Sequence, residues 1–361
     1  MKNTLCAFLA VLCCQFVFAQ QNGPMENWGI QRMGIEARAD YQREYVSGDA
    51  VKENCGFKGQ YLNFRVDGKF NEKLSYSYRQ RLYKAHEDQS FFDATDWLYL
   101  KYNVNDRWAF SAGKQVVAVG GYEYDRNPID IYFASEYWWN TRCYQWGVDA
   151  TYTFNDCKDM LLAQVCQSPY GSPFAPDGTT CYNDMYAYNL MWYGSHGWFN
   201  TTYSVNMVEY LPGQFINYIA LGHKLNMGDF SLEFDFMNRA VRNQTFLFKD
   251  CSLIGDLTYS TSENLNVFVK ASYDVNNSDK VGDYCVLPGT EVTRVSAGIE
   301  YFLLPDKSAR VHAALCQTFC SEEKAGVDFL PEQTMASVGL KWNMDLLALN
   351  PFSLFKKNIH K

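Results

Sequence analysis

The chain has 361 residues and a formal net charge of −8 at pH 7, with 32 Lys and Arg against 40 Asp and Glu. This acidic balance argues against a nucleic-acid partner, because nucleic-acid-binding proteins usually present a basic surface. Hydrophobic residues make up 47% and aromatic residues 17% of the chain, yet the mean hydropathy is only −0.31. Apolar and polar residues are therefore interleaved, and after residue 19 no run approaches the roughly 20 apolar residues that a membrane-spanning helix needs.

Residues 1–19 have the pattern of a secretory signal peptide. Lys2 provides a charged start, an apolar stretch follows, and Val17-Phe18-Ala19 offers a cleavage site before Gln20. We expect this segment to be removed during export. Loss of Lys2 would take the net charge from −8 to −9.

From residue 20 to 347 the chain repeats a strict two-residue alternation. Within 264–275, for example, apolar side chains stand at every second position, beginning at Leu265 and Val267. This period is typical of strands whose two faces meet different surroundings. We predict about sixteen such strands, with fourteen or eighteen as the alternative counts. They lie near residues 30–45, 57–70, 72–84, 94–105, 107–117, 142–155, 158–168, 184–194, 197–209, 214–226, 228–241, 251–261, 264–275, 291–303, 308–320 and 334–347.

The connections between these segments alternate between short and long. Asn71-Glu72 and Asn105-Asp106 join neighbouring strands almost directly, whereas 85–93 and 118–141 are extended. An even number of antiparallel strands can close into a barrel with an apolar exterior and a polar lumen, and closure leaves no unpaired backbone edge in the lipid. The predicted fold is an all-β transmembrane barrel over residues 20–347, followed by a basic periplasmic tail, 348–361.

No residue pattern predicts catalysis or a cofactor. Gly194-Ser195-His196-Gly197 places a serine beside a histidine but lacks the nucleophile-elbow pattern, so we predict that the protein is not an enzyme. Nine cysteines remain after the signal segment, without zinc-site spacing. We interpret most as small apolar residues and expect any disulfides to involve Cys181, Cys251 or Cys285, which lie near loops or strand ends.

Three arginines are predicted to face the lumen. Arg79 and Arg81 alternate with the apolar Leu74, Tyr76 and Tyr78 and should lie about 7 Å apart on one face; Arg65 follows the same rule in the preceding strand. They could form a basic ladder that attracts anions. Alternatively, they are wall charges paired with inward-facing acids, namely Glu36, Asp40, Glu233, Asp235, Asp256 and Asp274.

The fifth segment ends on Gly113-Lys114-Gln115 and leads into the longest connection, which contains Gly120-Gly121 and Arg126. In this region the chain resembles the phosphate-selective porin O and P family. The resemblance implies that the loop after the fifth strand folds inward and narrows the channel, with Lys114 and Arg126 near the constriction. It also implies passage of anions such as phosphate.

The same loop carries Glu123, Asp125 and Asp130, with Arg126 as the one base within 120–130. If these acids dominate, the pore would instead prefer cations. We predict an outer-membrane porin, embedded in outer-membrane lipid, that passes small hydrophilic solutes or ions and could form a homotrimer. The alternatives are a secreted or surface all-β binding protein or adhesin, and a barrel-type envelope hydrolase.

Overall fold

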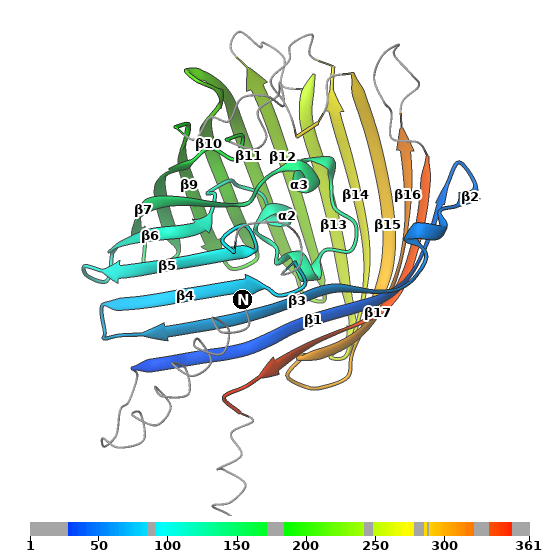
Figure 1. Cartoon of the computed structure of the whole chain (residues 1–361), viewed down its shortest axis with the longest axis horizontal. Helices are drawn as coiled ribbons and strands as arrows, with labels where there is room; N and C mark the ends of the chain where they lie inside the picture. The colour runs from blue at the N-terminus through cyan, green and yellow to red at the C-terminus, as the bar shows by residue number, and fades with distance from the viewer. Residues whose placement is uncertain are drawn as a thin grey trace, which may run out of the picture.

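The computed structural model describes residues 28–84, 91–171, 184–241, 248–277, 285–286, 289–320 and 332–348. Within these ranges, seventeen strands form a single antiparallel sheet, and one of them, β2 (Asp49–Ala50), has only two residues. The remaining sixteen confirm the predicted count. The first long strand pairs with both the second and the last, which closes the barrel (Figure 1).

The long strands are β1 (Gly29–Val46), β3 (Gly56–Lys69), β4 (Leu74–Arg81), β5 (Thr95–Asn103), β6 (Trp108–Val116), β7 (Tyr144–Phe154), β8 (Asp159–Gln167), β9 (Tyr186–His196), β10 (Phe199–Leu211), β11 (Gln214–Met227), β12 (Phe230–Val241), β13 (Asp250–Ser262), β14 (Leu265–Asn276), β15 (Thr290–Phe302), β16 (Ala309–Cys320) and β17 (Gln333–Asp345). A short 3-10 helix, η1 (Lys52–Asn54), lies between β2 and β3. None of the helices in the described ranges has the length and apolar composition to cross a membrane.

Short turns join the strands at one rim, and asparagine side chains close two of them. The Asn71 carboxamide oxygen accepts hydrogen bonds from the backbone N–H groups of Lys73 and Leu74, at 2.9 and 2.8 Å. The Asn105 carboxamide oxygen likewise accepts hydrogen bonds from the backbone N–H groups of Arg107 and Trp108, at 2.9 Å each. An asparagine that binds the backbone two or three residues ahead favours a tight turn, so both predicted turns have a local chemical cause.

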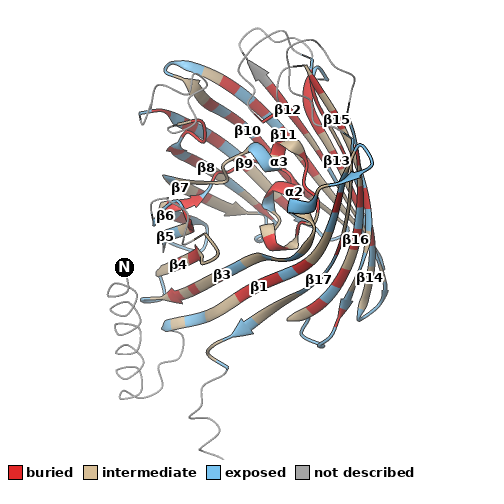
Figure 2. Ribbon diagram, turned by 45° about the vertical axis from the view of Figure 1, so that its right-hand side comes forward, coloured by how far each residue is buried: buried red, intermediate tan, exposed pale blue. Residues whose placement is uncertain are grey.

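The barrel is apolar outside and polar inside. On β5, for example, Leu98, Leu100 and Tyr102 are 39%, 48% and 46% exposed, whereas the residues between them face the lumen. Buried and exposed residues alternate along the strands in the same way around the wall (Figure 2). Removing the apolar outer faces from water requires lipid.

The connection between β6 and β7, residues 117–143, folds into the barrel, and we call it the constriction loop. It contains α2 (Tyr122–Asp125), η2 (Pro128–Asp130) and α3 (Glu136–Asn140), with both α-helices inside the wall (Figure 1). Tyr124 and Tyr137 pack into an apolar cluster with the wall residue Tyr218. The inward fold predicted for this loop is therefore what the structure shows.

The expectation of disulfides at Cys251 and Cys285 is wrong. Neither forms a disulfide, and both thiols are fully buried. Cys251 lies in β13, and the Cys285 sulfur is 3.0 Å from the Tyr170 hydroxyl and 3.2 Å from the Thr141 hydroxyl oxygen. Each fills a packed site where no second sulfur is bonded to it. Cys181, the predicted signal segment and residues 349–361 lie outside the described residues.

Candidate constriction of the channel

The constriction loop enters the lumen through Gly120-Gly121, which bind directly to β10. The Gly120 N–H donates to the Ser204 hydroxyl at 2.8 Å, and the Gly121 N–H donates to the Thr202 hydroxyl at 3.0 Å. Gly121 has φ +110°, a left-handed conformation that favours glycine. The adjacent wall residue, Gly222, has no side chain to obstruct the approach. The backbone of the constriction loop is thus in direct contact with the barrel wall at β10 and β11.

The next two N–H groups of the loop converge on one carboxylate of β12. Asp235 accepts hydrogen bonds from the N–H groups of Tyr122 and Glu123, at 2.8 Å each. The Glu123 side chain turns the other way and forms an ion pair with Lys270 of β14. Burial alone would raise the pKa of Glu123, but Lys270 and hydrogen bonds from Ser135 hold it below its ordinary value.

Arg126 ties the middle of the loop to two further strands. Its guanidinium lies 2.7 Å from an Asp256 carboxylate oxygen on β13 and also forms an ion pair with Glu233 on β12. Glu233 is shared with Lys224, at 2.8 Å. The Arg126 side chain remains 28% exposed, so these ion pairs are in contact with the lumen.

The following residue binds the far side of the barrel. The Asn127 side-chain oxygen accepts a hydrogen bond of 2.8 Å from Arg79 on β4. Arg79 also pairs with Glu36 at 3.3 Å and with Asp96 at 3.4 Å. β4 and β13 are the third and twelfth of the sixteen long strands. Two adjacent loop residues therefore connect nearly opposite walls.

Beyond Asn127, the loop is bound along β1 and β15–β17. Arg38 of β1 donates to the backbone oxygens of Ile129 and Ile131, at 3.3 and 2.8 Å. Asp130 forms ion pairs with Arg310, at 2.8 Å, and with Lys341. Although burial would raise the pKa of Asp130, these two cations hold it below its ordinary value. Glu136 similarly pairs with Arg294 of β15.

Arg65, Arg79 and Arg81 lie together, as the alternation predicted, but each faces a carboxylate. Arg65 lies 2.7 Å from Asp67, while Arg79 and Arg81 share Asp96. The guanidinium carbons of Arg65 and Arg79 lie 5.3 and 4.9 Å from the centre of the Trp97 ring. The three arginines therefore belong to a paired network around Trp97 and do not form an unneutralised ladder.

Lys114 does not lie at the constriction, contrary to expectation. Its cross-strand neighbours are Leu98 and Trp146, both exposed on the outer face, and paired residues share a face. Its ammonium donates to the backbone oxygen of Phe92, whose ring packs against Trp146. The spacing from Trp108, Phe110 and Ala112 already placed Lys114 on that outer face.

Of the three acids of α2 and η2, only Asp125 has an exposed side chain. Glu123 and Asp130 form ion pairs with basic residues of the wall. Two residues of the paired network of the three arginines, Asp96 and Trp97, are not indicated by the sequence pattern. Asp96 occupies an irregularity in the pairing of β4 with β5, which interrupts the alternation on which the prediction depended.

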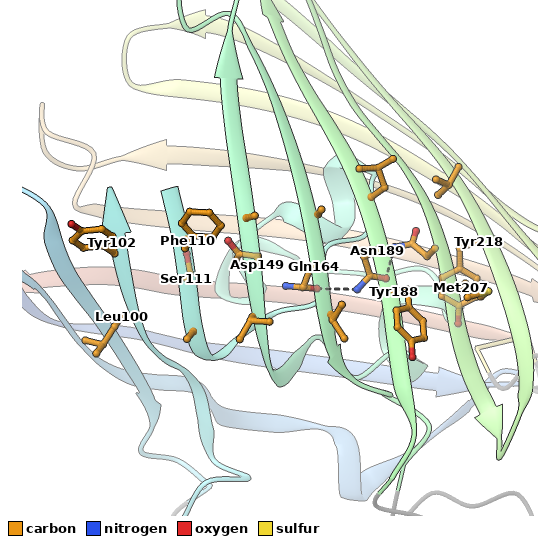
Figure 3. Close-up of a pocket in the computed structure, with 18 of the residues that line it drawn as sticks. Leu100, Tyr102, Phe110, Ser111, Asp149, Gln164, Tyr188, Asn189, Met207 and Tyr218 are labelled. Atoms are coloured by element: carbon orange, nitrogen blue, oxygen red, sulfur yellow. Dashed lines mark hydrogen bonds between the residues drawn. The ribbon is translucent and has the colours of Figure 1, made fainter. Parts of the chain in front are cut away.

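The outer wall carries a large apolar hollow over β5–β11, with a volume of about 1080 Å³. Its lining includes the small side chains Ala112, Ala150 and Ala163. Beneath it, polar residues of the wall bind one another, and the Asn189 amide donates to the Gln164 side-chain oxygen at 2.9 Å (Figure 3). The hollow thus lies behind the wall, outside the lumen.

Comparison with known proteins agrees with this architecture. The anion-selective porin from Comamonas acidovorans has a TM-score of 0.62 at 10% identity, covering 88% of this chain and 99% of that one. The outer-membrane channel DcaP of Acinetobacter baumannii gives 0.60 at 12% identity, covering 88% and 98%. OmpT of Vibrio cholerae gives 0.59 at 13% identity, also covering 88% and 98%.

No curated protein sequence matches the chain. The sequence model of the phosphate-selective porin O and P family matches residues 32–245, which is more than half of the chain. A closed barrel of sixteen long strands with a polar lumen and an inward-folded loop is the architecture of a porin. The chain belongs to the phosphate-selective porin O and P family.

Proposed function

We propose that the protein is a passive, water-filled channel of the outer membrane for small hydrophilic solutes and ions. The observation that carries this proposal is the constriction loop, which is held inside a polar lumen while the outer face of the same strands is apolar. A loop bound at this depth narrows a passage, and its ion pairs set the field that a solute meets.

Reconstitution into a planar bilayer tests the proposal. Purified protein should give discrete, step-like increases in conductance, and liposomes that contain it should swell in solutions of small sugars. If a correctly folded barrel gave no ion current and no swelling, the channel proposal would fail. A role in surface binding through the long loops would then be favoured.

Only the family description supports phosphate or other anions as the transported solutes. The wall arginines that would attract them are paired with carboxylates, so the lumen itself gives no separate argument for phosphate. Addition of phosphate to a chloride solution while single-channel conductance is recorded addresses this point. A saturable block of the chloride current would demonstrate a phosphate site.

We also propose that residues 1–19 direct export of the chain toward the outer membrane and are then cleaved off. Residues 348–361 are proposed to lie in the periplasm. The composition of both segments supports this. Membrane fractionation and N-terminal sequencing of the purified protein test it. A mature chain beginning at Gln20 in the outer-membrane fraction is expected, and an uncleaved chain would contradict the signal-peptide assignment.

A homotrimer is the proposed assembly. One solved structure with a TM-score of 0.56 to this chain is described as the trimer form of Vibrio cholerae OmpT, and the small residues of the outer hollow would allow close approach of another barrel. Ala163→Trp should convert the trimer to monomer in detergent, measured by light scattering. Ala187→Ser, at a fully buried position, is a control. An unchanged trimer would show that the hollow faces lipid.

A further inference from the structure

The bonds that anchor the constriction loop are unevenly distributed around the wall. Its printed bonds fall on β1, β4, β8, β10 and β12–β17. In the described part of the chain, no hydrogen bond or ion pair joins the loop to the lumen-facing side chains of β5–β7, such as Tyr99 and Asp149. The loop is therefore held by the other strands, and the β5–β7 side of the lumen carries none of its described bonds.

Asp125 is the last residue of α2 and lies near Tyr193 of β9, which is also within electrostatic range of Asp149 on β7. The Asp125 side chain is exposed, and among the described residues no basic side chain lies within ion-pair distance of it. Electrostatic interaction reaches from Asp125 to Glu233 and to the phenol of Tyr193 on β9. Asp125 is thus a carboxylate directed into the lumen without a bound countercharge.

The surrounding charges do not cancel it. Near Asp125, the carboxylates of Glu233 and Asp256 are matched by the two cations Arg126 and Lys224. These four groups balance, and the negative charge of Asp125 is left over. Asp235 also lacks a basic partner within the described residues, but it is buried and bound by two loop N–H groups, so Asp125 is the exposed carboxylate of this cluster that no cation balances.

The facing wall is close to neutral. Arg65 pairs with Asp67, and Arg79 and Arg81 lie against Glu36 and Asp96. Farther along, Asp149 of β7 lies within electrostatic range of Lys101. This part of the wall therefore supplies paired charges and the buried carboxylate of Asp149, while the loop supplies the exposed carboxylate of Asp125.

We propose that Asp125 is the residue that sets ion selectivity and that it makes the passage cation-preferring, although the family description names phosphate. The inference rests on the proposed channel function. Whether a narrow aqueous passage prefers cations or anions depends on the local charge at its wall rather than on the net charge of the whole chain. In this chain both are negative, and the local excess lies on Asp125.

The test is the reversal potential of reconstituted channels across a potassium chloride gradient. Wild type should favour potassium over chloride. Asp125→Asn should lower the permeability ratio by at least roughly two-fold, a small part of the ~10-fold or more by which a cleft of one charge sign concentrates counter-ions. Asp125→Lys should bring the ratio below that of Asp125→Asn and reverse the preference.

Glu263→Gln, which removes an exposed carboxylate from the turn between β13 and β14, is the matched control and should leave the ratio unchanged. Asp125 is exposed and forms no ion pair, so its variants should fold. A chloride-preferring wild type, or an Asp125→Asn channel that conducts with an unaltered ratio, would overturn the assignment. Absence of conductance in all variants and wild type would instead contradict the proposed channel function.

Discussion

Gly222 of β11 and Gly121 of the constriction loop are in backbone contact: a Cβ atom added at Gly222 would lie 2.8 Å from the Gly121 Cα and 2.9 Å from an oxygen of Asp235. Real Cβ atoms do not approach a backbone carbon so closely. The missing side chain at Gly222 is therefore a condition for seating the loop on the wall.

Gly222→Val is expected to lift the entry of the loop away from β10 and β12. The change should raise single-channel conductance and increase current noise, because a loop that loses its first anchor covers less of the lumen. Gly255→Val is the control, since a Cβ at Gly255 has no heavy atom within 4 Å. Equal conductance in the two variants would contradict the role assigned to Gly222.

Arg126→Gln is expected to release the middle of the loop. It removes the ion pairs to Glu233 and Asp256 and leaves Asp256 without its basic partner. We expect a loss of about 1–3 kcal/mol in the free energy of unfolding, between the values for exposed and buried pairs. We also expect a stronger preference for cations. Urea unfolding and reversal potentials measure the two effects, and an increased chloride permeability would contradict the second.

Acid should loosen the loop through Glu123 and Asp130. The pKa of each carboxyl is held below its ordinary value, 4.5 and 3.8 respectively. The stability that these groups contribute is therefore fully present above the ordinary values and is lost as the pH falls through the lowered pKa of the folded state. Thermal unfolding should be similar at about pH 7 and pH 5 and occur at lower temperature near pH 3. Glu123→Gln should reduce this acid dependence.

Asp125 should respond to acid at a higher pH than those two groups. Enclosure in the lumen and the nearby Glu233 raise its pKa above the ordinary value of 3.8, and Tyr122, Tyr193 and Arg126 are the other charged or titratable groups beside it. Protonation removes its charge. Cation preference should therefore decline as the pH falls, starting above 3.8, and Asp125→Asn should lack this component of the titration.

Arg79→Ala should destabilise the barrel far more than Arg65→Ala. Arg79 is 1% exposed and contacts Glu36, Asp96 and Asn127. Its removal leaves two buried carboxylates with one basic partner each, Arg32 and Arg81, at a cost near the lower end of the about 3–5 kcal/mol for a broken buried pair. The Arg65 side chain is 26% exposed and has one carboxylate partner. Urea unfolding measures the free energy of unfolding of the two variants. Equal losses would show that the buried contacts of Arg79 do not contribute more to stability than the contact of Arg65.

The number of strands could be predicted because it depends on local sequence, whereas the inward fold of the loop is what the family resemblance implies. Alternation reports which face of a strand meets lipid, and a turn such as Asn71-Glu72 marks where a strand ends. The predicted boundaries lie within a few residues of the observed ones; the third strand, for instance, was expected over 72–84 and occupies Leu74–Arg81.

The pairing of charges could not be predicted because it depends on which strands become neighbours across the lumen. Arg126 meets Asp256 over 130 residues of sequence, and no periodicity reports such a contact. Asp96 was missed because an irregularity between β4 and β5 shifts the register there. Lys114 continues the outward-facing series of Phe110 and Ala112, so its alternation places it on the outer face, whereas the family resemblance implies a position near the constriction.

The contacts of Arg126 and Asn127 with nearly opposite walls also have a mechanical consequence. A closed sheet of strands resists stretching along its hydrogen bonds, but its cross-section can become oval at little cost. Here such a deformation would have to lengthen or compress the bridge from Asp256 through the loop to Arg79. The bridge opposes a change in the distance between the two walls. Lateral pressure from the bilayer should therefore change the width of the channel only by straining the contacts of Arg126 and Asn127.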